Sequence, residues 1–114
     1  MKLVHQIKEE CLLLVLNGDL IGENSGAEIL EIVSDAMNDN IRAIAVDLGS
    51  VRYMNSSGLG VMITLLTKVK NKGGEVVMVN PSDQIKKILQ ITKLSDVFKS
   101  FDTEAEAIQV LKSK

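Results

Sequence analysis

The feature that most constrains the fold is a set of short, apolar runs separated by longer amphipathic segments. Residues 11–16, 41–48 and 75–79 are rich in leucine, isoleucine, valine and alanine and contain few polar residues. Runs of this kind are typical of strands buried on both faces, as in the interior of a parallel sheet. The stretches between them are long enough for helical crossovers. The order of these segments predicts an α/β fold with a mixed, mainly parallel sheet.

Two helices are predicted from apolar residues that recur at helical spacing. Residues 23–38 carry the first such pattern, which ends at Asn38-Asp39-Asn40. Residues 57–70 carry the second, because one helical face gathers the apolar side chains Leu59, Met62, Leu66 and Val69. Lys72-Gly73-Gly74 then supplies a C-terminal stop.

Two further helices are predicted from capping residues. Asn80 is expected to cap a helix over residues 82–91, with Pro81 at its first helical position. Thr103 is followed three residues later by Glu106, which fits a capping box at the start of a last helix that ends near residue 111. We expect Ile108 and Leu111 to point inward from that helix.

The remaining segments complete the sheet. Residues 2–7 predict a strand that can run antiparallel at an edge, and residues 97–101 a weak last strand. Two turns are expected: Asn17-Gly18-Asp19 ends the strand 11–16, and Gly49-Ser50 separates the strand 41–48 from a short extended piece. The prediction is one domain over residues 1–114, with about five strands and about four helices mostly on one face.

Composition and charge exclude several classes of function. The net charge is −2, from 13 basic and 15 acidic residues, which gives no excess field for binding nucleic acid or anionic lipid. No apolar run approaches the roughly 20 residues that cross a bilayer, and residues 1–3 do not begin a signal-peptide core. We therefore expect a cytoplasmic protein without nucleic-acid or membrane partners. Cys11, the one cysteine, lies in an apolar run and is expected to be a buried structural thiol.

The chain also lacks the residue sets that enzymes use. His5 is the sole histidine and is expected on the surface without a catalytic role, and no spacing suggests a metal site. Ser56 and Ser57 lack the glycine-flanked pattern of a hydrolase nucleophile. Gly58-Leu59-Gly60 matches no nucleotide-binding loop, so we interpret both glycines as allowing a sharp turn and close packing on the sheet. We expect no catalytic residue and no cofactor.

A polar turn interrupts two apolar segments within "YMNSSGLGVM", residues 53–62. Asn55-Ser56-Ser57-Gly58 stands where the helix over residues 57–70 begins. Two interpretations remain open for the hydroxyls. They can act as helix caps, or one of them can accept a phosphate, which the free N–H groups and the dipole at a helix N-terminus stabilise.

The chain resembles the STAS domain of bacterial anti-sigma-factor antagonists. The resemblance rests on "VDLGSVRYMNSSGLGVMITLLTKVKNKGGEVVMVNPSDQIKKILQITKLSDVF", residues 46–98, with Ser-Ser-Gly-Leu-Gly opening a helix. The earlier "NGDLIGENSG", residues 17–26, is similar to the family's turn after the second strand. Two positions depart from the family: it commonly has aspartate in place of Asn55 and often an acidic residue in place of Ile21.

The resemblance implies partner switching. An unphosphorylated antagonist binds an anti-sigma factor that is also a serine kinase, and this releases the sigma factor. Phosphorylation of the first serine of the motif, here Ser56, ends the complex, and a PP2C-type phosphatase restores it. Ser57 is the fallback acceptor.

The resemblance also implies a partner-binding surface and a monomer or weak dimer. That surface comprises the turn Gly18, Asp19 and Leu20 together with Asn55, Ser56, Ser57, Gly58, Leu59 and Gly60. The alternative is a STAS scaffold or a module for a small ligand or nucleotide, with both serines as plain caps.

Overall fold

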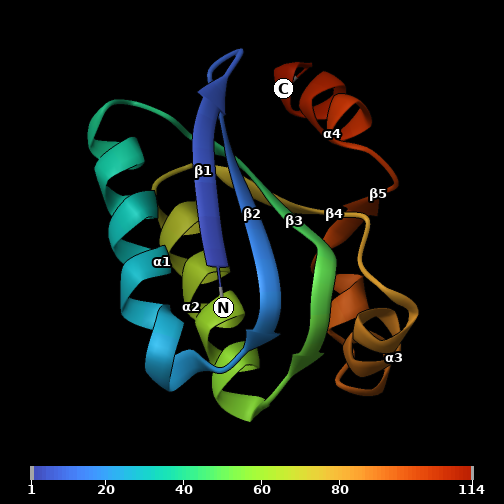
Figure 1. Cartoon of the computed structure of the whole chain (residues 1–114). Helices are drawn as coiled ribbons and strands as arrows, with labels where there is room; N and C mark the ends of the chain where they lie inside the picture. Colours follow the sequence, from blue (N-terminus) through green and yellow to red (C-terminus); the bar gives the residue numbers. More distant parts are fainter. Residues whose placement is uncertain (1, 114) are drawn as a thin grey trace.

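The fold is a five-stranded sheet with helices on both faces, seen in a computed structural model that describes residues 2–113, apart from the side chains of 22–25 (Figure 1). The strands lie in the order in which they occur along the chain. β1 pairs antiparallel with β2, and every later pair is parallel. The predicted α/β class and mainly parallel sheet are confirmed. The strands are β1 (Lys2–Lys8), β2 (Cys11–Leu20), β3 (Ala43–Met54), β4 (Glu75–Val79) and β5 (Lys99–Phe101).

The two central strands are longer than the sequence predicts. β2 continues to Leu20 through Asn17-Gly18-Asp19, and β3 continues to Met54 through Gly49-Ser50. Both predicted turns are therefore wrong. The added residues pair with each other across the two strands, with register shifts that mark β-bulges. A bulge lets a polar or glycine residue stay inside a paired strand, which a local turn rule does not anticipate.

The helices are α1 (Gly22–Asn38), α2 (Ser56–Asn71), α3 (Asp83–Ile91) and α4 (Glu104–Lys112), with a short 3-10 helix η1 (Leu94–Asp96) before β5. The predicted helices are confirmed to within about two residues. One cap is wrong: Ser82, not Asn80, caps α3 and accepts a hydrogen bond from the Ile85 N–H. Thr103 accepts from the Glu106 N–H, so the predicted cap of α4 is confirmed.

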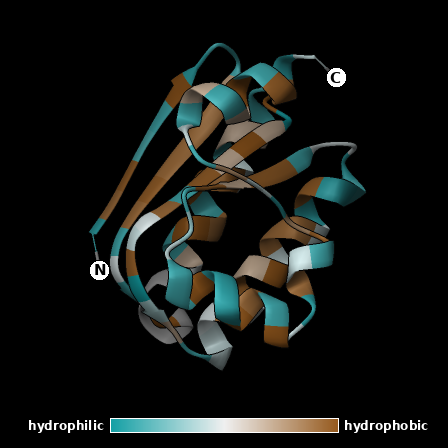
Figure 2. Ribbon diagram, turned by 90° about the vertical axis from the view of Figure 1, so that its right-hand side faces the viewer, coloured by the Kyte–Doolittle hydropathy of each residue, from teal (hydrophilic) through white to brown (hydrophobic). Residues whose placement is uncertain are grey.

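The sheet is covered unequally. α1, α2 and α3 pack on the face of the sheet that carries Leu12, Leu14 and Leu16 of β2, and α4 packs on the face that carries Cys11 and Leu13. Figure 1 shows α1 and α2 side by side, well apart from α4. Ile108 and Leu111 are buried under α4, as predicted. Figure 2 shows apolar residues concentrated along the strands, while the helices carry both apolar and polar residues.

No helix among residues 2–113 is both long and apolar enough to cross a membrane.

Candidate functional site at the start of helix α2

The polar turn of the sequence forms the junction between β3 and α2. Asn55 is the N-cap residue in an extended conformation, and its side-chain oxygen accepts a hydrogen bond from the Gly58 N–H at 2.8 Å. This bond satisfies one of the four N–H groups that a helix N-terminus leaves without a partner. The cap is therefore Asn55, and neither serine hydroxyl performs that function.

Gly58 fixes where the helix begins relative to the sheet. A Cβ atom at this position would overlap the carbonyl oxygen of Leu20, at the end of β2. The Asn55 N–H also donates to that carbonyl oxygen, at 3.4 Å. Only glycine allows such a close approach, so α2 starts directly against the end of β2. Gly60 has open space around it, and the close packing predicted for it is wrong.

Ser56 and Ser57 are the first two residues of α2, and both are exposed. The first turn of α2 contains no acidic residue, while Lys68 and Lys70 lie in its last turn. The positive end of the helix dipole is therefore not neutralised by a carboxylate of the helix itself. A phosphate on either hydroxyl would lie near this positive end.

The end of β2 lies beside the end of β3 and completes the site. Asp19 pairs in register with Tyr53, and Leu20 with Met54. The Asp19 carboxylate is 3.5 Å from an Arg52 guanidinium nitrogen. Both partners are exposed enough that such a pair contributes little to stability. This part of the surface therefore carries charges of both signs next to an uncharged helix start.

The structure brings the predicted partner-binding residues together but gives them different roles. Asn55 is partly exposed, like Leu59, and Gly60 is exposed with the serines. Gly58 and Leu20 are buried, so they position the turn and present no side chain to a partner. Gly18, at a φ of 112°, occupies backbone space that favours glycine.

Sequence reasoning missed two exposed residues at this site, Arg52 and Tyr53. Tyr53 is 53% exposed, although aromatic side chains usually bury much of their surface. The signal was in the strand pattern: Val51 and Met54 are buried, and the two residues between them point outward at the bulged end of β3.

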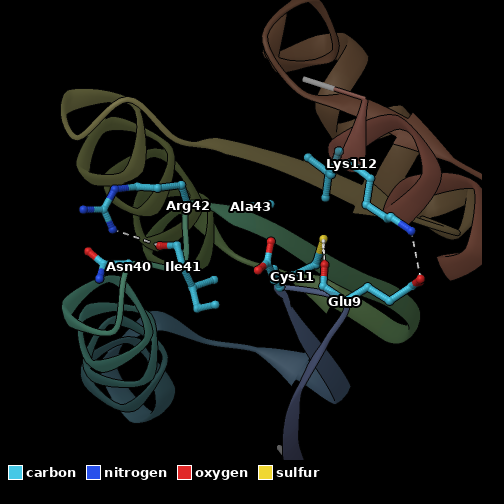
Figure 3. Close-up of a pocket in the computed structure, with 9 residues that line it drawn as sticks. Glu9, Cys11, Asn40, Ile41, Arg42, Ala43 and Lys112 are labelled. Atoms are coloured by element: carbon cyan, nitrogen blue, oxygen red, sulfur yellow. Dashed lines mark hydrogen bonds and ion pairs between the residues drawn. The ribbon is translucent and has the colours of Figure 1, made fainter.

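A hollow lies at the end of the sheet opposite to this site, where β2 and β3 begin (Figure 3). It has a volume of about 380 Å³. Lys112 and Glu9 form an ion pair at 2.9 Å on its rim, and Arg42 donates to the carbonyl oxygens of Met37 and Ile41. The lining residues are Glu9, Glu10, Cys11, Asn40, Ile41, Arg42, Ala43, Leu111 and Lys112.

Cys11 is buried as predicted, and burial, followed by the nearby Glu9 carboxylate, raises the pKa of its thiol. A raised pKa disfavours the thiolate, the reactive form of cysteine. His5 is exposed on β1 as predicted. Among the described residues, no group of three or more histidine, cysteine or acidic side chains could hold a metal ion.

Comparison with known proteins gives the family. The STAS domain family matches residues 2–107. The chain belongs to the STAS domain family. The predicted resemblance is thereby confirmed, and the sheet order and helices described above are the STAS fold.

Two relatives and one pair of structures illustrate the likeness. A Thermotoga neapolitana protein, named provisionally as an anti-sigma factor antagonist, is 27% identical over 110 residues, or 96% of this chain and 97% of its own. The anti-sigma-B factor antagonist of Staphylococcus aureus is 33% identical over 70 residues, or 61% of this chain and 65% of its own.

The structures are those of the anti-sigma factor antagonist SpoIIAA of Bacillus. Its unphosphorylated form matches with a TM-score of 0.84 and 22% identity, over 99% of this chain and 98% of SpoIIAA. Its phosphorylated form matches with a TM-score of 0.75 and 23% identity, over 95% and 97%. These likenesses show the fold.

Proposed function

We propose that this STAS domain is a non-enzymatic anti-sigma-factor antagonist, which binds an anti-sigma factor through the start of α2 and the neighbouring ends of β2 and β3. The observation that carries the proposal is an exposed pair of hydroxyls, Ser56 and Ser57, at a helix start already capped by Asn55. Since neither hydroxyl is needed for the cap, both are free for another use. The names of the relatives support the same role. It would operate in the cytoplasm, where sigma factors act.

The proposed switch is phosphorylation of Ser56 by the anti-sigma factor, acting as a serine kinase. A PP2C-type phosphatase would remove the phosphate. A phosphate adds about −1.5 to −2 charges, which the free N–H groups of the first turn of α2 stabilise. A partner that buries the neutral hydroxyl would then have to bury a charged phosphate and remove its hydration water. This desolvation cost disfavours the complex. Ser57 is the second candidate acceptor.

The Asn55 side chain bears on this switch. Relatives of this family commonly have aspartate here, whose charge would repel a phosphate on the next residue. Asparagine keeps the cap and removes that repulsion, so phosphate on Ser56 would be tolerated better. The absence of an acidic side chain at Ile21 acts in the same direction.

The direct test is to incubate the protein with its anti-sigma factor kinase and ATP and to map the phosphate by mass spectrometry. We expect phosphate on Ser56, and none there in Ser56→Ala. Phosphate on neither Ser56 nor Ser57 would refute the switch. Binding gives a separate readout: Ser56→Asp should weaken the complex while Ser56→Ala keeps it. Equal affinities would show that the turn lies outside the interface.

A second candidate function is a small-ligand module, and the hollow of about 380 Å³ at the far end of the sheet favours it. Its lining combines acidic and basic side chains with apolar ones, which fits a small zwitterion. Thermal shifts with a panel of amino acids would test it, because a ligand that binds only the folded state raises the melting temperature. No shift across the panel would reject this candidate, and a shift abolished by Arg42→Ala would support it.

A further inference from the structure

A groove between β1 and α1 has no role in the proposed switch. It has a volume of about 250 Å³ and is lined by His5, Ile7, Leu12, Ile32, Asp35, Ala36 and Asp39. Ile7 is 54% exposed at its edge. α1 runs back from the end of β2 toward the start of β3, so the groove beside Asp35 and Asp39 lies far from Ser56 along the sheet (Figure 1).

One rim of this groove is acidic. Glu28, Glu31, Asp35 and Asp39 follow one another at intervals of three and four residues, so they form one stripe along α1. All four are exposed, and no ion pair in the described part of the chain involves any of them. Residues 22–41 contain no lysine, arginine or histidine. We call the groove together with this stripe the acidic groove.

The stripe opposes the local stability of α1. Carboxylates four residues apart repel each other, and carboxylates at the C-terminal end of a helix oppose its dipole. α1 has no basic residue in its last turn, and Arg42 Nη1 donates to backbone carbonyl oxygens there. The Arg42 guanidinium offsets the dipole at this end of α1, but the repulsion among the carboxylates remains. A residue pattern that costs local stability is expected where a surface serves binding.

The same chain carries a surface of opposite character on α3 and η1. Lys87 and Ile91 lie one turn apart on α3 and are both exposed, and the exposed residues Lys93 and Val97 flank η1. Ile91 is 76% exposed, the largest value among the large apolar side chains described, and Val97 is 47% exposed. Asp83 and Asp96 are the acidic residues of this region, against Lys86, Lys87 and Lys93. We call Lys87, Ile91, Lys93 and Val97 the basic patch.

We propose that the basic patch of one copy docks into the acidic groove of a second copy. Ile91 would enter the apolar part of the groove, and Lys87 and Lys93 would reach the carboxylates of Asp35 and Asp39 while their aliphatic stems cover apolar surface. α1 lies toward the β1 edge of the sheet, and α3 toward the other edge (Figure 1). The two surfaces therefore face different neighbours, and the association is head-to-tail.

Sedimentation equilibrium over a range of protein concentrations tests this proposal. We expect the average mass to rise with concentration at about 0.02 M salt and to fall back toward the monomer at about 0.5 M salt, because salt screens the opposite charges. Asp35→Lys/Asp39→Lys, and separately Lys87→Glu/Lys93→Glu, should each weaken association about tenfold or more. An equimolar mixture of the two variants should restore it, because each supplies the surface that fits the other.

Two controls separate this proposal from other effects. Glu10→Lys/Glu106→Lys changes the net charge as much as the groove variant does and should leave association unchanged, as should Ser56→Ala. Restoration in the mixture shows that both reversed variants are folded. A wild-type protein that stays monomeric at low salt would overturn the proposal, and so would two reversed variants whose mixture remains monomeric.

Discussion

Helices α1 and α2 lie side by side on the same face of the sheet, yet only α2 follows the usual rules for capping and charge at helix ends. α2 begins at a side-chain cap and ends with lysines, which suit the negative end of its dipole. α1 begins at Ile21, which makes no side-chain cap, and ends at Asp39 without a basic residue in its last turn. α2 is a helix that its own sequence supports, while α1 depends on its surroundings.

The difference shows what holds each helix. α1 buries Ile29, Val33 and Met37 against the sheet, and a Cβ at Gly26 would lie only 2.7 Å from a methyl group of Val61 on α2. Burial of this kind outweighs a poor cap, since one fully buried side chain contributes about 1.5–3 kcal/mol and one cap about 1 kcal/mol. The termini of α1 are therefore free to carry an unfavourable charge pattern.

The largest expected effect comes from Gly58, where α2 meets β2. Gly58→Ala should destabilise the protein by about 3 kcal/mol or more, because the added methyl group overlaps the backbone of Leu20 and no flexible side chain can move away. Gly60→Ala is the matched control in the same helix turn. It should stabilise by about 0.5–1 kcal/mol, since its surroundings are open. Urea unfolding measures both, and a similar loss in the two variants would contradict the role given to Gly58.

The next effect concerns the cap that distinguishes α2 from α1. Asn55→Ala should cost about 1 kcal/mol, because the Gly58 N–H loses its acceptor. Asn55→Asp should keep the stability of the wild type, since both side chains cap equally well. If the two variants have the same unfolding free energy, the cap does not stabilise α2.

A smaller effect of opposite sign is expected at the end of α1. Asp39→Lys should stabilise the protein by about 0.5 kcal/mol, because it places a cation at the negative end of the helix and removes a repulsion from Asp35. Asp39→Asn should give a smaller gain. A stabilised variant that also associates less would show that the acidic groove is kept for binding. Thermal unfolding at low salt measures the gain, and a loss of stability would contradict this account of α1.

The smallest expected effect on stability comes from Glu104, a half-buried acid in α4, in contrast to the exposed acids of α1. Burial raises the pKa of Glu104, and so does the nearby Asp47 carboxylate, through its negative charge and by accepting a hydrogen bond from the protonated Glu104 carboxyl. The folded protein therefore holds this proton more tightly than the unfolded chain, and the resulting stability is present at low pH and lost as the pH rises through the folded-state pKa.

Glu104→Gln should accordingly be slightly more stable than the wild type at neutral pH, with no advantage once the wild-type carboxyl is protonated. Melting temperatures measured from neutral pH down to about 4 would show the difference shrinking. A constant difference across this range would show that the effect has another cause.

Much of the fold could be predicted because its signals are local. The buried strand β4 has the predicted bounds, and the ends of the helices follow from Thr103 and Lys72-Gly73-Gly74. The errors occur where two distant segments pair. Asn17-Gly18-Asp19 has the composition of a turn, but the paired end of β3 keeps it extended. For Asn80 the local rule indicated a cap, while its N–H donates to the Phe101 carbonyl oxygen and Ser82 caps the helix.

The candidate site shows the same division. The motif at Ser56 could be found from the sequence, because it combines residue types that together open a helix. Which of its neighbours reach the surface could not be found, since that depends on how the ends of β2 and β3 meet. Leu20 and Gly58 are buried, while Arg52 and Tyr53 are exposed.

The sequence by itself determined the α/β class, the helix starts and the hydroxyl-bearing turn, because these depend on apolar periodicity and on contacts between residues close in the chain. Only the tertiary structure decided that β2 reaches Leu20 and that glycine is needed at position 58 and not at 60. It alone showed that an acidic groove and a basic patch lie at different edges of the sheet. Those features depend on how closely segments far apart in the chain approach each other, and a local pattern of residues does not give such distances.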